Sequence, residues 1–229
     1  MTKNKIEKNS IGFPKNQGLY DSSNEHDSCG VGFIVDTNNH ASHDIVSKGL
    51  SMLCNLEHRG AVGADPKAGD GSGILLQIPH EFFKKEINHF QIPEQNDYAV
   101  GVFFLKKDEK LKDKILKKIE DVCAKENIPF LGWRLCPTYE DELGWSVKPT
   151  TPFVYHLFVG KPEDISKQDD FERKIYVLRQ CIDKEIMIMG DEYYDQFYIP
   201  SFSSRTILYK GMVLSDQVGT VGNKLGFFD

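Results

Sequence analysis

The sequence predicts an α+β or α/β fold in which helices cover β-sheets. Two observations indicate this class: apolar runs of strand length alternate with amphipathic stretches of helix length, and no repeat or low-complexity segment interrupts them. With 229 residues, of which 40% are apolar, the chain is long enough to bury a sizeable core. Its length fits one large domain or two small ones.

The first segment differs in composition from the rest of the chain. Residues 1–28 are predicted to form an unstructured leader, because Lys, Asn and Ser dominate and large apolar side chains are few. The pattern changes at residues 29–36 (CGVGFIVD), which are predicted to form a strand. Residues 43–57 place apolar side chains at helical spacing, with Ser42 as the expected N-cap and Gly60 as the expected stop.

The remaining elements follow in alternation. The Gly-rich stretch 69–73 is predicted to form a tight turn, and the ILLQI run after it a short strand. Further strands are expected at 98–105, 130–135 and 153–159, and helices at 79–86, 108–127 and 170–189. Residues 197–214 are predicted to form two strands that meet around Tyr209-Lys210-Gly211.

Composition argues against several functional classes. The net charge of −6 argues against nucleic acid as the main partner, because phosphate binding needs a basic face. No run of about 20 apolar residues occurs, so no membrane span is predicted. The N-terminus lacks the apolar core of a secretory signal. The five cysteines are odd in number and scattered, which predicts a reducing, cytoplasmic location rather than a disulfide framework.

Cys29 has two interpretations. It is either a small buried residue that opens a strand or a nucleophile that becomes the first residue of the mature protein. A thiol with an ordinary pKa near 8.5 needs a base at neutral pH, and a free α-amino group, with a pKa of about 7.7 to 8.0, is suited to that role. Removal of residues 1–28 would place nucleophile and base on one residue.

Other candidate residues keep a structural alternative. Arg59, in Glu57-His58-Arg59-Gly60, either ends a helix or binds a substrate carboxylate in a bidentate manner. Arg205, in a polar turn, could face an acidic ligand. Cys54 and His58 lie four residues apart on one helix face, but their spacing matches no usual zinc finger, so no metal site is predicted. The Gly-rich stretch does not lead into a helix or a Lys-Ser/Thr pair, so it is interpreted as a turn rather than a phosphate loop.

Taken together and in order, four blocks resemble one family. They are YDSSNEHDSCGVGFIVD, LEHRGAVGAD, GDGSGILLQIP and SFSSRTILYKGMVL. The chain is similar, over roughly residues 18–218, to the N-terminal amidotransferase domain of the glutamate synthase large chain. That domain is a class II glutamine amidotransferase, an N-terminal-nucleophile hydrolase. The resemblance implies a four-layer αββα sandwich, with residues 1–28 as a propeptide and residues 29–229 as a partial domain.

The resemblance also implies roles and partners. The freed Cys29 would attack the side-chain amide of L-glutamine, and Arg59 would help to hold the α-carboxylate of that substrate. Ammonia would pass to the remaining synthase domains, which use FMN and an iron–sulfur cluster; no cofactor is expected in this segment. No membrane or nucleic-acid partner is expected.

The chain departs from the family pattern near its end. The family continues with an R-x-S-T-N-T block and an H-N-G-E block, whose Asn-Gly pair supplies the oxyanion hole, and neither occurs before Asp229. Loss of one oxyanion donor costs roughly 10² to 10³ in rate. The alternative expectation is therefore a fold incomplete at its C-terminus, that is, a catalytically incomplete fragment with no activity of its own.

Overall fold

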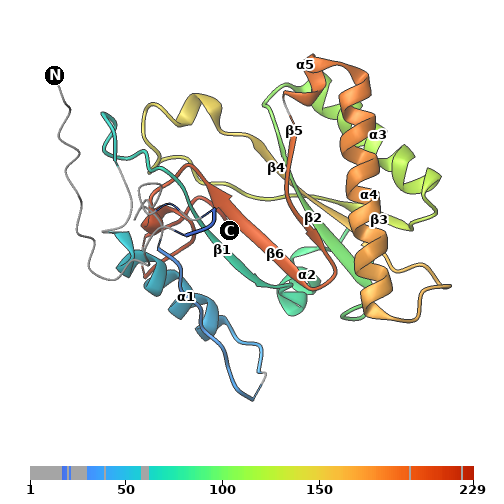
Figure 1. The fold of residues 1–229 in the computed structure, drawn as a ribbon, viewed down its shortest axis with the longest axis horizontal. Coiled ribbons are helices and arrows are strands. Elements are labelled where there is room, and N and C mark those ends of the chain that lie inside the picture. Colours follow the sequence, from blue (N-terminus) through green and yellow to red (C-terminus); the bar gives the residue numbers. More distant parts are fainter. Residues whose placement is uncertain are drawn as a thin grey trace.

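The computed structural model describes residues 17–19, 21, 30–38, 40–57, 62–195, 197–222 and 224–229. Cys29 and Arg59 lie outside these ranges, and so does most of the predicted leader. The boundary between residues 28 and 29 therefore stays a prediction. Figure 1 shows the described elements as two sheets with helices beyond each of them. None of the described helices has the length and apolarity needed to cross a bilayer.

Most predicted elements are confirmed to within a few residues. Within the described ranges the helices are α1 (His43–Asn55), α2 (His80–Glu86), α3 (Glu109–Lys125), α4 (Gln168–Met189) and α5 (Asp191–Tyr194). The strands are β1 (Ser72–Gln77), β2 (Tyr98–Leu105), β3 (Phe130–Leu135), β4 (Phe153–Gly160), β5 (Phe197–Ser203) and β6 (Thr206–Gly211). Ser42 occupies the N-cap position of α1, although its side chain makes no capping hydrogen bond.

The larger sheet is antiparallel and has the strand order β3-β4-β2-β5. The β2–β4 register runs without a break from Tyr98 opposite Gly160 to Leu105 opposite Phe153. Nearly every residue of β2 is buried, as expected for a central strand that is covered on both faces. The smaller sheet pairs β1 with β6, from Ser72 opposite Gly211 to Gln77 opposite Thr206.

The two faces of the larger sheet border two different apolar cores. On one face, β2 and β4 pack against α3 and α4 through a core that includes Phe103, Ile119 and Leu178. On the other face, they pack against β6, with α1 lying beyond it, through a core that includes Val100 and Ile207. Figure 1 shows the resulting order: α3 and α4, the larger sheet, the β1–β6 pair and α1. The chain thus has the helix–sheet–sheet–helix layering that the resemblance implies.

The strand predicted for residues 29–36 is wrong for the part that the structure describes. Residues 30–36 carry no strand assignment. Val31, Phe33 and Val35 are exposed by 91%, 87% and 70%. Their alternation has the period of a strand, but a strand also needs a backbone partner for its N–H and C=O groups, and periodicity does not supply one.

The predicted position of the last hairpin turn is also wrong. The turn lies at Ser204 and Arg205, whereas Tyr209-Lys210-Gly211 lies inside β6. The reason is a long-range contact: Glu172 of α4 accepts hydrogen bonds from the Ser204 backbone N–H (2.6 Å) and the Ser203 hydroxyl (3.0 Å). The polar turn that the sequence indicates around Arg205 is where the two strands meet, but its contact with Glu172, about 30 residues away, is not visible in the sequence.

Candidate active site

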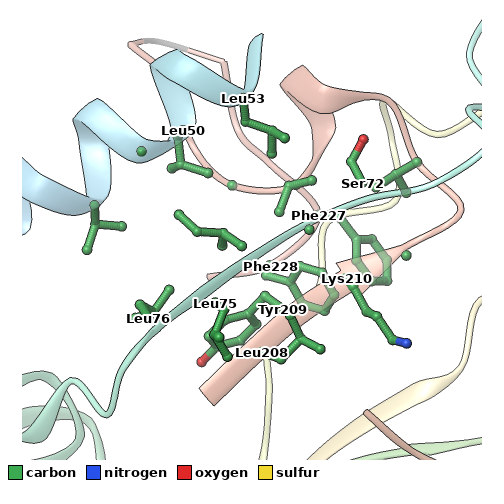
Figure 2. A pocket seen from close by; sticks show the side chains of 18 of the residues that line it. Leu50, Leu53, Ser72, Leu75, Leu76, Leu208, Tyr209, Lys210, Phe227 and Phe228 are labelled. Atoms are coloured by element: carbon green, nitrogen blue, oxygen red, sulfur yellow. The ribbon is translucent and has the colours of Figure 1, made fainter. Parts of the chain in front are cut away.

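A large cleft lies between α1, the β1–β6 sheet and the extended segment 30–36. Its volume is about 2710 Å³, which exceeds the roughly 300 to 1,000 Å³ of a typical ligand pocket. Figure 2 shows Leu50 and Leu53 pointing from α1 into the cleft, with Tyr209, Phe227 and Phe228 across from them. The cleft is therefore mainly apolar and larger than an amino-acid substrate requires.

The residues that flank both sequence-predicted site residues line this cleft. Gly30, which directly follows Cys29, lies in its wall. Glu57 and Val62, on either side of the stretch that contains Arg59, lie in the same wall. Cys29 and Arg59 lie outside the described residues, but the chain on both sides of Arg59 and after Cys29 leads into one cleft.

The Gly-rich turn at 69–73 forms another part of the wall, and β1 begins inside it at Ser72. A Cβ atom on Gly69 would lie 2.6 Å from the Val213 carbonyl oxygen, and one on Gly73 would lie 2.7 Å from the Tyr209 carbonyl oxygen. Glycine is required at these positions because the backbone of β6 and of the segment that follows it approaches so closely. The stretch lines the cleft wall, but the predicted turn covers only residues 70 and 71, because Gly69 forms a bridge with Val62 and Ser72 and Gly73 belong to β1.

The other cysteines are not among the residues that line the cleft. Cys54, Cys123, Cys136 and Cys181 are free thiols, and none of them lines the cleft. Burial raises the pKa of all four, to about 12 for Cys123. Since the thiolate is the nucleophilic form, these four thiols are poorly suited to attack at neutral pH.

A buried polar cluster that sequence reasoning missed reaches the cleft wall at Asp229. The Arg134 guanidinium pairs with the Asp229 carboxylate and lies 3.4 Å from His156 Nδ1. Burial opposes the positive charge of Arg134, but the Asp229 carboxylate outweighs burial and raises the Arg134 pKa. Burial, with the Arg134 charge, lowers the pKa of His156 to about 3. No signal in the sequence indicates this cluster, because the alternation expected in β3 places Leu131, Trp133 and Leu135 on the face opposite Arg134.

His80 is a second residue that sequence reasoning missed. It opens α2 and lies in the cleft wall, and its Nδ1 atom is 3.1 Å from the Tyr98 hydroxyl. Both residues are buried, and burial raises the pKa of Tyr98. The pair fixes the start of α2 against the central strand β2 at the base of the cleft.

The remaining predicted candidates have other surroundings. Arg205 pairs with Asp169 at the exposed β5–β6 turn and does not line the cleft, so a role toward a ligand there is not supported. His58, one half of the Cys54–His58 pair, lies outside the described residues. Among the residues that the structure describes, no group of three or more His, Cys, Asp or Glu side chains is arranged to hold a metal ion.

Comparison with known proteins gives the family. Residues 29–226 match the model of the glutamine amidotransferases of class II. The chain is 41% identical over 205 residues to the glutamate synthase [NADPH] large chain of Bacillus subtilis, covering 90% of this chain and 13% of that protein. It is 42% identical over 197 residues to the ferredoxin-dependent glutamate synthase of Pyropia yezoensis, covering 85% of this chain and 12% of that protein.

A third relative, the glutamate synthase [NADH] of Saccharomyces cerevisiae, is 41% identical over 217 residues, covering 90% of this chain and 10% of that protein. The chain therefore spans only about a tenth of the length of these curated relatives. The family match, in contrast, begins at Cys29 and covers most of the chain. The chain belongs to the class II glutamine amidotransferases.

Proposed function

We propose that the chain is the glutaminase part of a glutamate synthase, with Cys29 as nucleophile. The observation that carries this proposal is the convergence on one cleft of Gly30, next to Cys29, and of Glu57 and Val62, on either side of the Arg59 stretch. The four described cysteines do not line this cleft and have raised pKa values. The start of the family match at Cys29 supports the same assignment.

The chemistry follows from the position of Cys29. After removal of residues 1–28, the α-amino group of Cys29 takes the proton of its own thiol, because its pKa lies close to neutral. The sulfur attacks the side-chain amide carbon of L-glutamine, and the amide nitrogen leaves as ammonia with the transferred proton. A γ-glutamyl thioester forms, and water then cleaves it to give glutamate and the free thiol. Arg59 holds the substrate α-carboxylate through its guanidinium.

The remaining synthase domains are the proposed partners and consume the ammonia, and their FMN and iron–sulfur cluster are proposed to supply the redox chemistry. The described residues of this chain do not offer a fit for such a cluster, since no three or more His, Cys, Asp or Glu side chains converge. We assign no step in this chain to those groups. A reducing cytoplasmic location belongs to the same proposal, and the four free thiols support it.

Covalent labelling tests the proposal. A chain that begins at Cys29 is treated with a glutamine-mimicking diazoketone, and the modified peptide is mapped by mass spectrometry. We expect an adduct on Cys29 that forms at least about tenfold faster than on any other cysteine, because the others are held as thiols. The Cys29→Ser variant is the matched control and should lose the adduct. An adduct only on Cys54 or another described cysteine, or none at all, contradicts the proposal.

A further inference from the structure

The loop that leads from the Arg59 stretch to β1 is fastened by a buried carboxylate. Val62 and Gly69 form an isolated antiparallel bridge, which closes the loop between them. Asp65 lies at the far end of this loop and is 5% exposed. It lies six positions after Arg59 and does not line the cleft, so it cannot touch a ligand there.

Asp65 is fully engaged by a second loop. One carboxylate oxygen accepts hydrogen bonds from the Ser146 backbone N–H (2.8 Å) and the Ser146 hydroxyl (2.7 Å). The other accepts one from the Lys67 backbone N–H (3.1 Å). These hydrogen bonds, the Ser146 N–H first, lower the pKa of Asp65. Gly144 admits the carboxylate, since a Cβ there would lie 2.3 Å from the Asp65 Oδ2 atom.

A buried amide side chain also links the loop that contains Asp65 to the loop that contains Ser146. Gln217 is 2% exposed, and its Nε2 donates to the Lys67 carbonyl (3.2 Å) and the Glu142 carbonyl (2.8 Å). The Gly144 backbone N–H also donates to the Lys67 carbonyl (3.2 Å). The Lys67–Glu142 ion pair, in contrast, is about half exposed at both ends and contributes little.

We propose that Asp65 is a positioning residue for the substrate α-carboxylate, acting through the loop that follows Arg59; this inference rests on the proposed function. The side chains of Asp65 and Gln217, both buried, and five backbone groups hold a loop that carries almost no core of its own. Their effect is to fix the point at which the chain leaves the cleft wall at Val62, three residues after Arg59. A bidentate guanidinium–carboxylate contact depends on such placement, because a displacement of about 1 Å lowers the reaction rate on the order of 10²-fold.

The experiment compares two electrophiles on the chain that begins at Cys29. The glutamine-mimicking diazoketone carries an α-carboxylate, whereas iodoacetamide does not. We expect Asp65→Asn to slow diazoketone labelling of Cys29 by about tenfold and to leave iodoacetamide labelling within about twofold. Arg59→Ala should show the same selective loss, and the double variant should lose no more than Arg59→Ala alone, since Asp65 acts through Arg59.

Matched controls separate positioning from folding. Glu142→Gln removes only the exposed ion pair between the same loops and should label as the unaltered chain does. Circular dichroism establishes that each variant is folded. If Asp65→Asn is not folded, it is replaced by Ser146→Ala, which removes one hydrogen bond to Asp65. This variant should slow labelling by the diazoketone only, and by a smaller factor. Equal slowing with both reagents, or unchanged diazoketone labelling, overturns the inference. No labelling of Cys29 in the unaltered chain by the diazoketone contradicts the proposed function instead.

Discussion

The α3–α4 layer and the α1 layer differ in how completely they are packed. On the α3–α4 side, Phe103, Phe171 and Leu178 are fully buried. On the α1 side, a cleft of about 2710 Å³ opens between α1 and the β1–β6 sheet, and Phe33 beside it is exposed by 87%. The difference teaches that apolar composition alone does not determine burial. The first side is packed for stability, whereas the second is lined by Gly30, Glu57 and Val62, which are described neighbours of the residues assigned to chemistry.

The largest effect expected from this contrast is on stability. Phe103→Ala should lower the free energy of unfolding by about 3 to 5 kcal/mol, because it removes a fully buried ring that contacts Trp133, Phe197 and Phe202. Phe33→Ala, the matched change on the cleft side, should alter it by no more than about 0.5 kcal/mol. Urea unfolding monitored by circular dichroism measures both. Equal losses in the two variants would show that the two sides are packed alike.

A second effect, which develops only on acidification, comes from His156 between the two sides. Its pKa falls from 6.5 to about 3 on folding, so the unfolded chain binds more protons between these values. The histidine therefore favours the native state fully above pH 6.5, and that contribution is lost as the pH falls toward 3, by up to about 1.4 kcal/mol per pH unit.

The His156→Gln variant isolates this contribution. Arg134 and Asp229 face the ring, and the buried His156 Nε2 has no hydrogen-bond partner among the described residues, so no described group compensates a second proton there. The slope of unfolding free energy against pH between 3 and 6.5 should become shallower in the variant. Parallel curves for the two proteins would exclude a neutral, buried His156.

The sequence predicted the well-packed side better than the cleft side. The apolar run YAVGVFFL defined β2 to the residue, and helical spacing located α3 and α4 to within about two residues. Local pattern is sufficient there because each element is long and buried along a whole face. Cys29 and Arg59 could be chosen from their chemistry and from the family resemblance, but the convergence of their neighbours on one cleft is a property of the tertiary structure.

The features that escaped prediction depend on distant contacts. The hydrogen bond from the Ser204 N–H to Glu172 joins residues 32 positions apart, and the Arg134–Asp229 pair joins residues 95 positions apart. Residues 30–36 have the alternation of a strand, but a strand is defined by its pairing. Asp65 ends the LEHRGAVGAD block, but the sequence assigned it no contact, because its hydrogen bonds to Ser146 join residues that are 81 positions apart.

The central claim is that one residue supplies both the attacking sulfur and the base. Its most direct test is the N-terminal residue of the active protein isolated from its native host, determined by mass spectrometry alongside a glutamine hydrolysis assay. We predict that the active protein begins at Cys29, with residues 1–28 removed. Glutamine hydrolysis by a protein that still carries those residues would contradict the claim.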